Sequence, residues 1–192
     1  MHLERLVAMA PTLALPTASL ELRRFTTADV PFAVAQENDR TIMRWIRDAQ
    51  PADAVQARAE SMAAAWTGKE GEWLALVAHE RATGRAVGLV VCRVTSAESQ
   101  TMEIGYRFDA GVHRRGYGLQ ACTALIAFLF REVRVRKLVA CCVSDNEPSW
   151  RLMAKLGMQR EAWFREYTHL AGAWRDEFVY GLLAREWSPP TA

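Results

Sequence analysis

A short segment in the second half of the chain combines glycines with basic side chains: His113, Arg114, Arg115, Gly116, Tyr117 and Gly118. A segment of alternating apolar and polar residues precedes it, and a segment with helical spacing of apolar residues follows it. The free N–H groups and positive dipole end of a helix start bind anions, and glycines allow close approach to the backbone. Arginines add charged donors for phosphate oxygens. We therefore interpret residues 113–118 as a cradle for a diphosphate; a tight turn that needs glycines only for its geometry is the alternative.

The sequence lacks the other common motifs of phosphate binding and nucleophilic catalysis. Its glycines do not have the spacing of a P-loop, and they lie too far from the N-terminus for a dinucleotide fold. The chain has no Gly-x-Ser-x-Gly segment, the motif that exposes a serine nucleophile on a sharp turn. The four cysteines form no Cys-x-x-Cys pair and the four histidines are scattered, so the spacing predicts no metal site.

A strand, a helix and a second strand are predicted to position the cradle. Residues 101–108 alternate, with the even-numbered residues on one apolar face and Glu103 on the other. Residues 119–133 repeat apolar side chains at steps of three and four, which predicts an amphipathic helix. The apolar run 138–143 predicts a buried strand. This order predicts a right-handed crossover between two parallel strands.

The remaining segments predict further strands and helices around this unit. Turn residues, caps and apolar periodicity indicate strands at 19–25, 73–79, 86–94, 159–169 and 174–184, and helices at 26–38, 53–67 and from Asn146 to Gly157. Hairpins join the second strand to the third and the last two to each other. The predicted fold class is therefore α/β, with a mixed, mostly antiparallel sheet, a parallel βαβ crossover and about four flanking helices.

Composition limits the classes of protein to which the chain can belong. It has 192 residues, of which 51% are hydrophobic and 24% charged, values typical of one globular domain with a core of its own. The net charge of +2 argues against a nucleic-acid-binding protein, and no apolar run is long enough to span a membrane.

The two ends of the chain and the cysteines allow predictions about the termini and the cellular location. Glu4 and Arg5 interrupt the apolar stretch that a signal peptide needs, so residues 1–18 are interpreted as an irregular arm. Residues 188–192 are interpreted as a tail. All four cysteines lie in apolar runs, which indicates reduced, buried thiols and a cytoplasmic location.

The order of these motifs resembles the GCN5-related N-acetyltransferase (GNAT) family. The cradle matches the family motif Gln/Arg-x-x-Gly-x-Gly/Ala, with residues 102–106 (MEIGY) before it. Asn146-x-x-Ser149 and residues 155–158 (KLGM) follow in the family order. The likeness covers residues 19–187 and implies a single acetyltransferase domain with a GNAT-like sheet.

Two details qualify the resemblance. The closing hairpin, with Trp174-x-Asp176, is similar to the branch that acetylates the N-termini of ribosomal proteins, the RimJ/RimL type. His113 stands where the family usually has Gln, Arg or an aromatic residue, and Arg114 replaces a small residue. The backbone cradle is expected to survive both changes, while its side-chain contacts to the diphosphate differ.

The resemblance implies direct transfer of an acetyl group from acetyl-CoA to a primary amine, without a metal. The amine must lose a proton, which a positioned carboxylate can accept directly or through water. Glu103 on the strand before the cradle is the predicted base, and a solvated strand carboxylate is the alternative reading. Backbone N–H groups around Tyr106 are expected to bind the thioester carbonyl, and the strands are expected to splay near Phe108 to admit the pantetheine.

The next helix is expected to serve the leaving group. Ser149 is predicted to donate a proton to the departing thiolate, and a hydroxyl that satisfies the local backbone is the alternative. Asn146 is expected to cap this helix and, secondarily, to contact the pantetheine. Trp45, in an aromatic loop between the first two helices, is the predicted acceptor contact, although a packing role is equally compatible with the sequence.

The expected acceptor is a protein N-terminal α-amine. Its pKa of about 8 leaves part of it neutral at pH 7, whereas a lysine amine at about 10.4 is almost fully protonated. A small amine such as a polyamine or an aminoglycoside is the alternative acceptor, and the mixed charge of residues 36–50 does not decide between the two. A non-catalytic acyl-CoA-binding module is the alternative from another class. No nucleic-acid or membrane partner is expected, and a homodimer is compatible with the resemblance.

Overall fold

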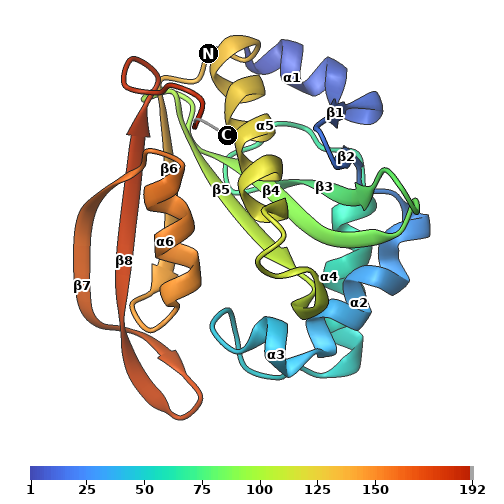
Figure 1. Cartoon of the computed structure of the whole chain (residues 1–192), viewed down its shortest axis with the longest axis vertical. Coiled ribbons are helices and arrows are strands. Elements are labelled where there is room, and N and C mark those ends of the chain that lie inside the picture. Colours follow the sequence, from blue (N-terminus) through green and yellow to red (C-terminus); the bar gives the residue numbers. More distant parts are fainter. Residues whose placement is uncertain (191–192) are drawn as a thin grey trace.

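The computed structural model describes residues 1–190 and contains a single eight-stranded mixed sheet (Figure 1). The strand order across the sheet is β1-β2-β3-β4-β5-β6-β8-β7. The strands are β1 (Ala14–Pro16), β2 (Leu20–Arg24), β3 (Trp73–Glu80), β4 (Ala86–Ser96), β5 (Thr101–Phe108), β6 (Lys137–Val143), β7 (Gln159–Leu170) and β8 (Ala173–Leu183). The α-helices are α1 (Leu3–Met9), α2 (Val30–Asn38), α3 (Arg40–Met43), α4 (Ala52–Ala63), α5 (Tyr117–Arg131) and α6 (Glu147–Lys155).

The predicted crossover is present as β5–α5–β6. β5 and β6 are parallel, and all other neighbouring strands of the described sheet are antiparallel. The parallel pairing covers only three residue pairs, from Thr101 opposite Lys137 to Glu103 opposite Val139. Beyond Glu103 the two strands diverge, and Figure 1 shows the sheet opening between β5 and β6. The expected splay therefore exists, and it begins closer to the start of both strands than predicted.

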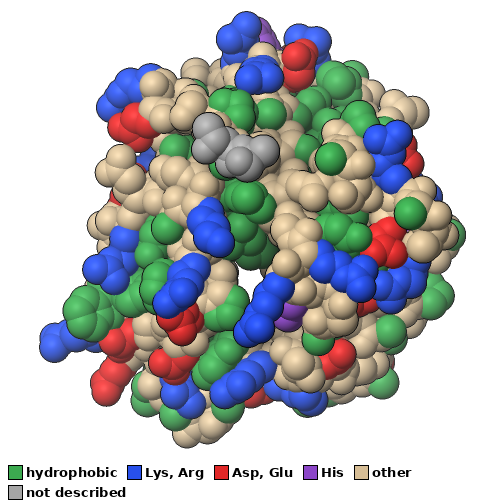
Figure 2. Space-filling model, viewed as in Figure 1, with side chains coloured by type: hydrophobic (Ala, Val, Ile, Leu, Met, Phe, Trp, Pro, Cys, Tyr) green, Lys and Arg blue, Asp and Glu red, His purple; other side chains and the backbone are tan. Residues whose placement is uncertain are grey.

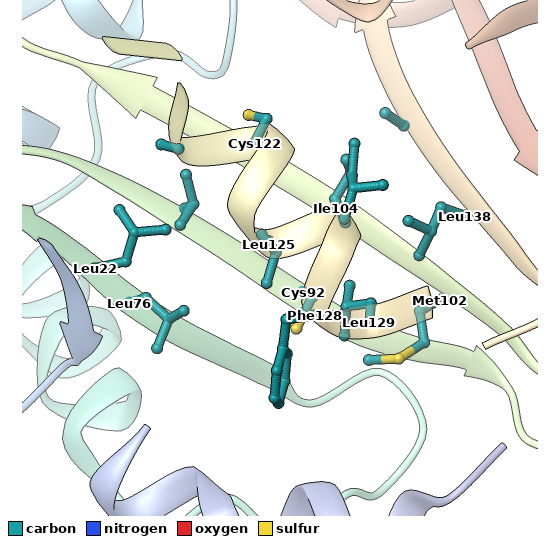
Figure 3. Close-up of a cluster of buried hydrophobic side chains, with 14 of the residues drawn as sticks. Leu22, Leu76, Cys92, Met102, Ile104, Cys122, Leu125, Phe128, Leu129 and Leu138 are labelled. Atoms are coloured by element: carbon teal, nitrogen blue, oxygen red, sulfur yellow. The ribbon is translucent and has the colours of Figure 1, made fainter. Parts of the chain in front are cut away.

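The core lies mainly between the sheet and α5. Leu125, Ile126 and Leu129 on the buried face of α5 are at most 1% exposed. They pack with side chains of β2 to β6, several of which are labelled in Figure 3. The alternate residues of β3, such as Val77, belong to a second cluster with α2 and α4. Because successive strand residues point to opposite faces, α5 and α2/α4 cover opposite sides of the sheet.

The prediction of an irregular arm at residues 1–18 is wrong, because this segment forms α1, a 3-10 turn and β1. Leu6 and Ala10 lie on one face of the helical segment and are at most 2% exposed, and the N–H of His2 donates to the carbonyl of Val133. Their i, i+4 spacing is amphipathic, but burial of these side chains in the main hydrophobic core gives the short helix its stability. With α1 and the one-turn α3, the described chain has six α-helices rather than about four.

Other boundaries follow local chemistry. α4 ends at Ala63, before the predicted Gly68, because the guanidinium of Arg24 donates to the carbonyls of Met62 and Ala64 at its C-terminus. α6 ends at Lys155 with Leu156 as C-cap, and Gly157 takes the predicted left-handed position after it, with φ of 85°. Residues 191 and 192 of the predicted tail lie outside the described residues. No helix within residues 1–190 has the length and apolar content to cross a membrane.

The cysteines depart from the prediction at one position. Cys92, Cys122 and Cys142 are buried, whereas Cys141 on β6 is exposed. All four are free thiols. Cys141 is exposed because β6 loses its β5 neighbour after Val139, so this part of the strand borders an open space rather than a covered sheet face.

Candidate active site

A cavity of about 1620 Å³ opens where β5 and β6 diverge. Its walls come from β5, the start of α5, α6, the segment between α2 and α4, and the β7–β8 hairpin. Figure 2 shows an opening near the centre of this face, with Lys and Arg side chains on its rim and a His side chain beside it. Lining residues with these side chains include Arg44, Arg114, His113, Arg151 and Lys155. The cavity is therefore open to solvent and basic at its rim.

The predicted cradle forms the start of α5 and faces this cavity. Gly116 is the N-cap with φ of 76°, and Arg114 also has a positive φ, of 63°. A Cβ added at Gly116 would meet no atom within 4 Å, so the space over the helix start is open. The first N–H groups of a helix have no acceptor within that helix. Open space above free donors at a 15-residue helix suits a diphosphate.

Gly118 has a packing role in addition. A Cβ at this position would lie 3.0 Å from Cδ2 of Leu152 on α6. This separation is tighter than ordinary van der Waals contact, so α5 and α6 can approach each other only with a glycine here or a shift of Leu152. The second glycine of the motif therefore also fixes the distance between the two helices that flank the cavity.

The two adjacent arginines have different environments. Arg114 lines the cavity, whereas Arg115 does not and instead donates to Glu80 Oε1 at 3.3 Å. The hydroxyl of Tyr117 donates to the same oxygen at 2.8 Å, and hydrogen bonds from Tyr117 and Thr83 lower the pKa of Glu80. The structure therefore does not bring Arg115 to the predicted phosphate position. The positive φ of Arg114 turns the backbone between the two side chains, so they point to different places. The sequence gives no sign of this difference, because both residues are arginines.

Glu103 lies on the cavity floor as part of an ion pair. Arg93, opposite it on β4, donates to its Oε2 through Nε at 2.8 Å and Nη2 at 2.6 Å. Arg93 also stacks 4.4 Å from the ring centroid of Trp73. Within residues 1–190, Oε1 of Glu103 accepts no hydrogen bond from a protein group, and the side chain is 16% exposed. Arg93 thus fixes the carboxylate while one oxygen remains available to accept a proton.

Ser149 faces Tyr106 across the cavity wall. Its hydroxyl lies 3.1 Å from the hydroxyl of Tyr106, which also donates to the carbonyl of Ser149 at 3.0 Å. Burial raises the pKa of Tyr106 above its ordinary range, so the phenol keeps its proton and remains a donor. From the sequence, Tyr106 was expected to contribute only backbone groups. The structure adds a hydroxyl pair that joins β5 to α6 at the open end of the splay.

We expect Ser149→Ala to lower kcat about 10- to 100-fold with little change in acetyl-CoA affinity, because a proton donor to the thiolate acts only in the transition state. Steady-state kinetics combined with a thermal melt tests this. A capping role would instead lower the free energy of unfolding by about 0.5–2 kcal/mol with normal kcat. The structure records no side-chain cap at the start of α6. A lower melting temperature with unchanged kcat would contradict the acid role.

The other predicted residues all line the cavity. His113 places Nε2 3.2 Å from the carbonyl oxygen of Phe108, which is itself 9% exposed and belongs mainly to the core. Asn146 is the N-cap of α6 by position, but its side chain makes no capping hydrogen bond. Trp45 lies under the guanidinium of Arg44, 4.5 Å from the ring centroid. These four residues therefore border the space that a ligand would occupy.

Sequence reasoning missed a group of charged residues on the α2–α4 side of the cavity. Glu37 Oε1 lies 2.7 Å from Nη1 of Arg58 and 3.3 Å from Nε of Arg47, and its Oε2 accepts from Arg107 Nη1 at 2.7 Å. Glu177 on β8, which accepts from Thr168 at 2.8 Å, was also missed. Two sequence signals concerned this group: Arg107 shared the predicted face of Glu103, and residues 36–50, which include Glu37 and Arg47, carry mixed charge.

No metal centre is apparent in the described part of the chain. Within residues 1–190, no three His, Cys, Asp or Glu side chains are arranged to hold a metal ion.

Comparison with known proteins identifies the family. A model of the acetyltransferase (GNAT) domain matches residues 19–159, and the chain therefore belongs to the GNAT acetyltransferase family. The chain is 35% identical over 88 residues to the uncharacterized N-acetyltransferase YnaD of Bacillus subtilis. It is 28% identical over 86 residues to the ribosomal protein uS5-alanine N-acetyltransferase of Escherichia coli.

These two matches cover 46% and 45% of this chain, and the chain spans only about half the length of the two relatives, 52% and 44%. The uncharacterized N-acetyltransferase YoaA of Bacillus subtilis is 24% identical over 88% of this chain and 96% of its own length.

Solved structures confirm the fold. An acetyltransferase of the GNAT family from Bacillus anthracis superposes with a TM-score of 0.78 at 23% identity, covering 91% of this chain and all of that one. A structure of RimL, a ribosomal L7/L12 α-N-protein acetyltransferase, gives a TM-score of 0.77 at 17% identity over 90% of this chain and 94% of its own. At such identities the likeness concerns the fold alone.

Proposed function

We propose that this protein is an N-acetyltransferase that transfers the acetyl group of acetyl-CoA directly to a primary amine. One observation carries the proposal. The open helix start at Gly116, the carboxylate of Glu103 and the hydroxyl of Ser149 all face the single cavity created by the splay of β5 and β6. Family membership supports the same cofactor and the same type of reaction.

Each part of the cavity has a distinct task in this proposal. The N–H groups at the start of α5, with Arg114, bind the diphosphate, and the pantetheine enters between the diverging strands. β5 has no β6 partner beyond Glu103, so it can offer free backbone groups to the pantetheine and the thioester carbonyl.

Two side chains handle the protons. Glu103 accepts the amine proton at Oε1, directly or through water, and the neutral nitrogen attacks the thioester carbonyl carbon. When the carbon–sulfur bond breaks, the Ser149 hydroxyl, held by its contact with the Tyr106 hydroxyl, donates a proton to the thiolate. The proton that remains on the attacking nitrogen passes to Ser149, directly or through water, so the products are the amide and the free thiol of CoA.

The proposed acceptor is the α-amine of a protein N-terminus. Such an amine is partly neutral at pH 7, so one carboxylate suffices to complete its deprotonation. The uS5-alanine N-acetyltransferase among the relatives supports this class of acceptor. The width of the cavity also supports it, because it extends from the β5–β6 splay to the α2–α4 side and its walls hold Trp45.

We further propose a cytoplasmic location. The free state of all four cysteines supports it, since a reducing compartment keeps thiols unpaired. The oligomeric state, for which a homodimer is one candidate, is measured by light scattering on the purified chain.

An amine panel tests the proposed activity. Release of free thiol from acetyl-CoA is measured with short peptides that have free N-termini, with the same peptides blocked at the N-terminus, with spermidine and with an aminoglycoside. We expect turnover on free peptides and none on the blocked ones. Turnover confined to spermidine or the aminoglycoside would assign a small-amine acceptor. Binding of acetyl-CoA without turnover on any amine would make the protein a silent acyl-CoA-binding module.

A further inference from the structure

The α2–α4 side of the cavity carries more positive charge than its single carboxylate balances. Three arginines surround Glu37, whose side chain is 5% exposed: Arg107 is 12% exposed, and Arg47 and Arg58 are 35% and 36% exposed. All four side chains line the cavity. The group therefore has a formal surplus of two positive charges beside the proposed acceptor position.

The arginines of this group have N–H donors that form no hydrogen bond with the described residues. A guanidinium has five N–H donors. Within residues 1–190, Arg58 makes one hydrogen bond through its side chain, to Glu37, and Arg47 makes a contact of 3.3 Å through Nε. Arg107 is more fully used, because it also donates to Gln36 at 3.1 Å. The half-exposed Arg47 and Arg58 thus retain donors, whereas Arg107 fixes the group to β5.

The other carboxylates of the cavity do not offset this surplus. Glu103 is held by Arg93, Glu177 accepts from Thr168, and Glu72 accepts from the N–H and hydroxyl of Thr67. Each of these three carboxylates therefore binds a partner outside the group around Glu37. Burial lowers the pKa of Arg47, Glu37 opposes this, and the nearby Arg58 and Arg107 lower it further, as expected where like charges are close.

We propose that Arg47 and Arg58 bind a carboxylate side chain of the acceptor peptide, so that the enzyme prefers protein N-termini with an Asp or Glu at the second or third position. The inference rests on the proposed function and specifies its substrate class. A bound carboxylate would use the unmet donors and reduce the surplus charge, and a polyamine would be repelled by the same group.

The dimensions of the site fit such a peptide. Glu103 and Arg107 lie on the same face of β5, four residues apart, which corresponds to about 13 Å along a strand. Gly105 between them has no side chain of its own, and the surface at this point is formed by the side chains of Val91 and Trp73. An extended peptide rises about 3.3–3.6 Å per residue, so with its amine near Glu103 the third residue lies about 7 Å further along, and an acidic side chain and a long arginine side chain together span the remaining distance.

Matched peptides test the preference. The experiment compares kcat/KM for acetyl transfer within pairs of peptides. The two members of the first pair differ only in having Asp or Asn at the second position, and those of the second pair differ in the same way at the third position. We expect wild type to favour the Asp member of one pair by about tenfold at low ionic strength, with the ratio falling as KCl is added. Arg58→Gln and Arg47→Gln should each bring the ratio close to one, because each lowers kcat/KM on the Asp peptides more than on the Asn peptides.

A matched control separates local from general charge effects. Arg185→Gln removes the same charge from an exposed position after β8, where its side chain is 76% exposed, and should retain the tenfold ratio. Free aspartate and asparagine form a third pair, which distinguishes a small acceptor from a peptide. N-acetylated Asp and Asn peptides, used as inhibitors of wild type, give a readout that does not depend on the variants folding.

The possible outcomes distinguish the two proposals. Equal transfer to the Asp and Asn peptides, or a preference that survives in both arginine variants, would overturn this inference and leave the proposed function standing. Transfer to free aspartate without transfer to the peptides would overturn the peptide assignment. No transfer to any amine would overturn the proposed function, and this inference with it.

Discussion

Glu103→Gln is expected to slow acetyl transfer at neutral pH by about 10²–10⁴-fold, the usual effect of removing a general base. Glutamine keeps the shape of the side chain and one hydrogen-bond acceptor for Arg93, but it cannot take the amine proton at the position of Oε1. The loss should shrink as pH rises, because a growing fraction of the α-amine is already neutral. A pH–rate profile of kcat/KM for both proteins measures this.

Glu177→Gln is the matched control for this experiment. It changes another carboxylate that lines the cavity, and this one is engaged by Thr168 on the β7–β8 hairpin. We expect its rate loss to be much smaller than that of Glu103→Gln and independent of pH. A larger rate loss in Glu177→Gln, or a pH–rate profile of Glu103→Gln identical to that of wild type, would show that Glu103 is not the base.

The sequence predicted the elements whose pattern is local. Alternation over 101–108 and the helical stripe of 119–133 identified β5 and α5, because one face of each is buried along its whole length. These two elements and β6 position the cradle, Glu103 and the splay, so the central part of the candidate site was predictable. α1 was not, since a seven-residue helix owes its stability to packing in the hydrophobic core rather than to its own sequence.

The contacts that depend on distant residues were beyond the sequence. Glu37 meets Arg58 and Arg107 across 21 and 70 positions of the chain, and no periodicity links residues so far apart. Arg115 is a similar case: its partner Glu80 lies 35 positions away, so two adjacent arginines with the same chemistry were given the same role. In both cases the fold, rather than the local pattern, decides which charges meet.

Gly116→Val should weaken the binding of CoA at least tenfold, measured by calorimetry on the folded variant. Gly116 starts α5 with φ of 76° beside the open space proposed for the diphosphate. A branched side chain there occupies that space and blocks approach to the helix N–H groups. Because charge contributes to the binding, the affinity of wild type should also fall as salt is added.

Strain must be separated from this blocking effect, because a non-glycine residue in the left-handed region costs about 1–2 kcal/mol wherever it occurs. Gly172→Val provides the comparison. Gly172 has φ of 73° and a Cβ there would also meet no atom within 4 Å, but it lies in the β7–β8 turn. Both variants should lose similar stability in a thermal melt, and only Gly116→Val should lose CoA affinity. Equal CoA affinity in the two folded variants would show that the diphosphate does not bind at the start of α5.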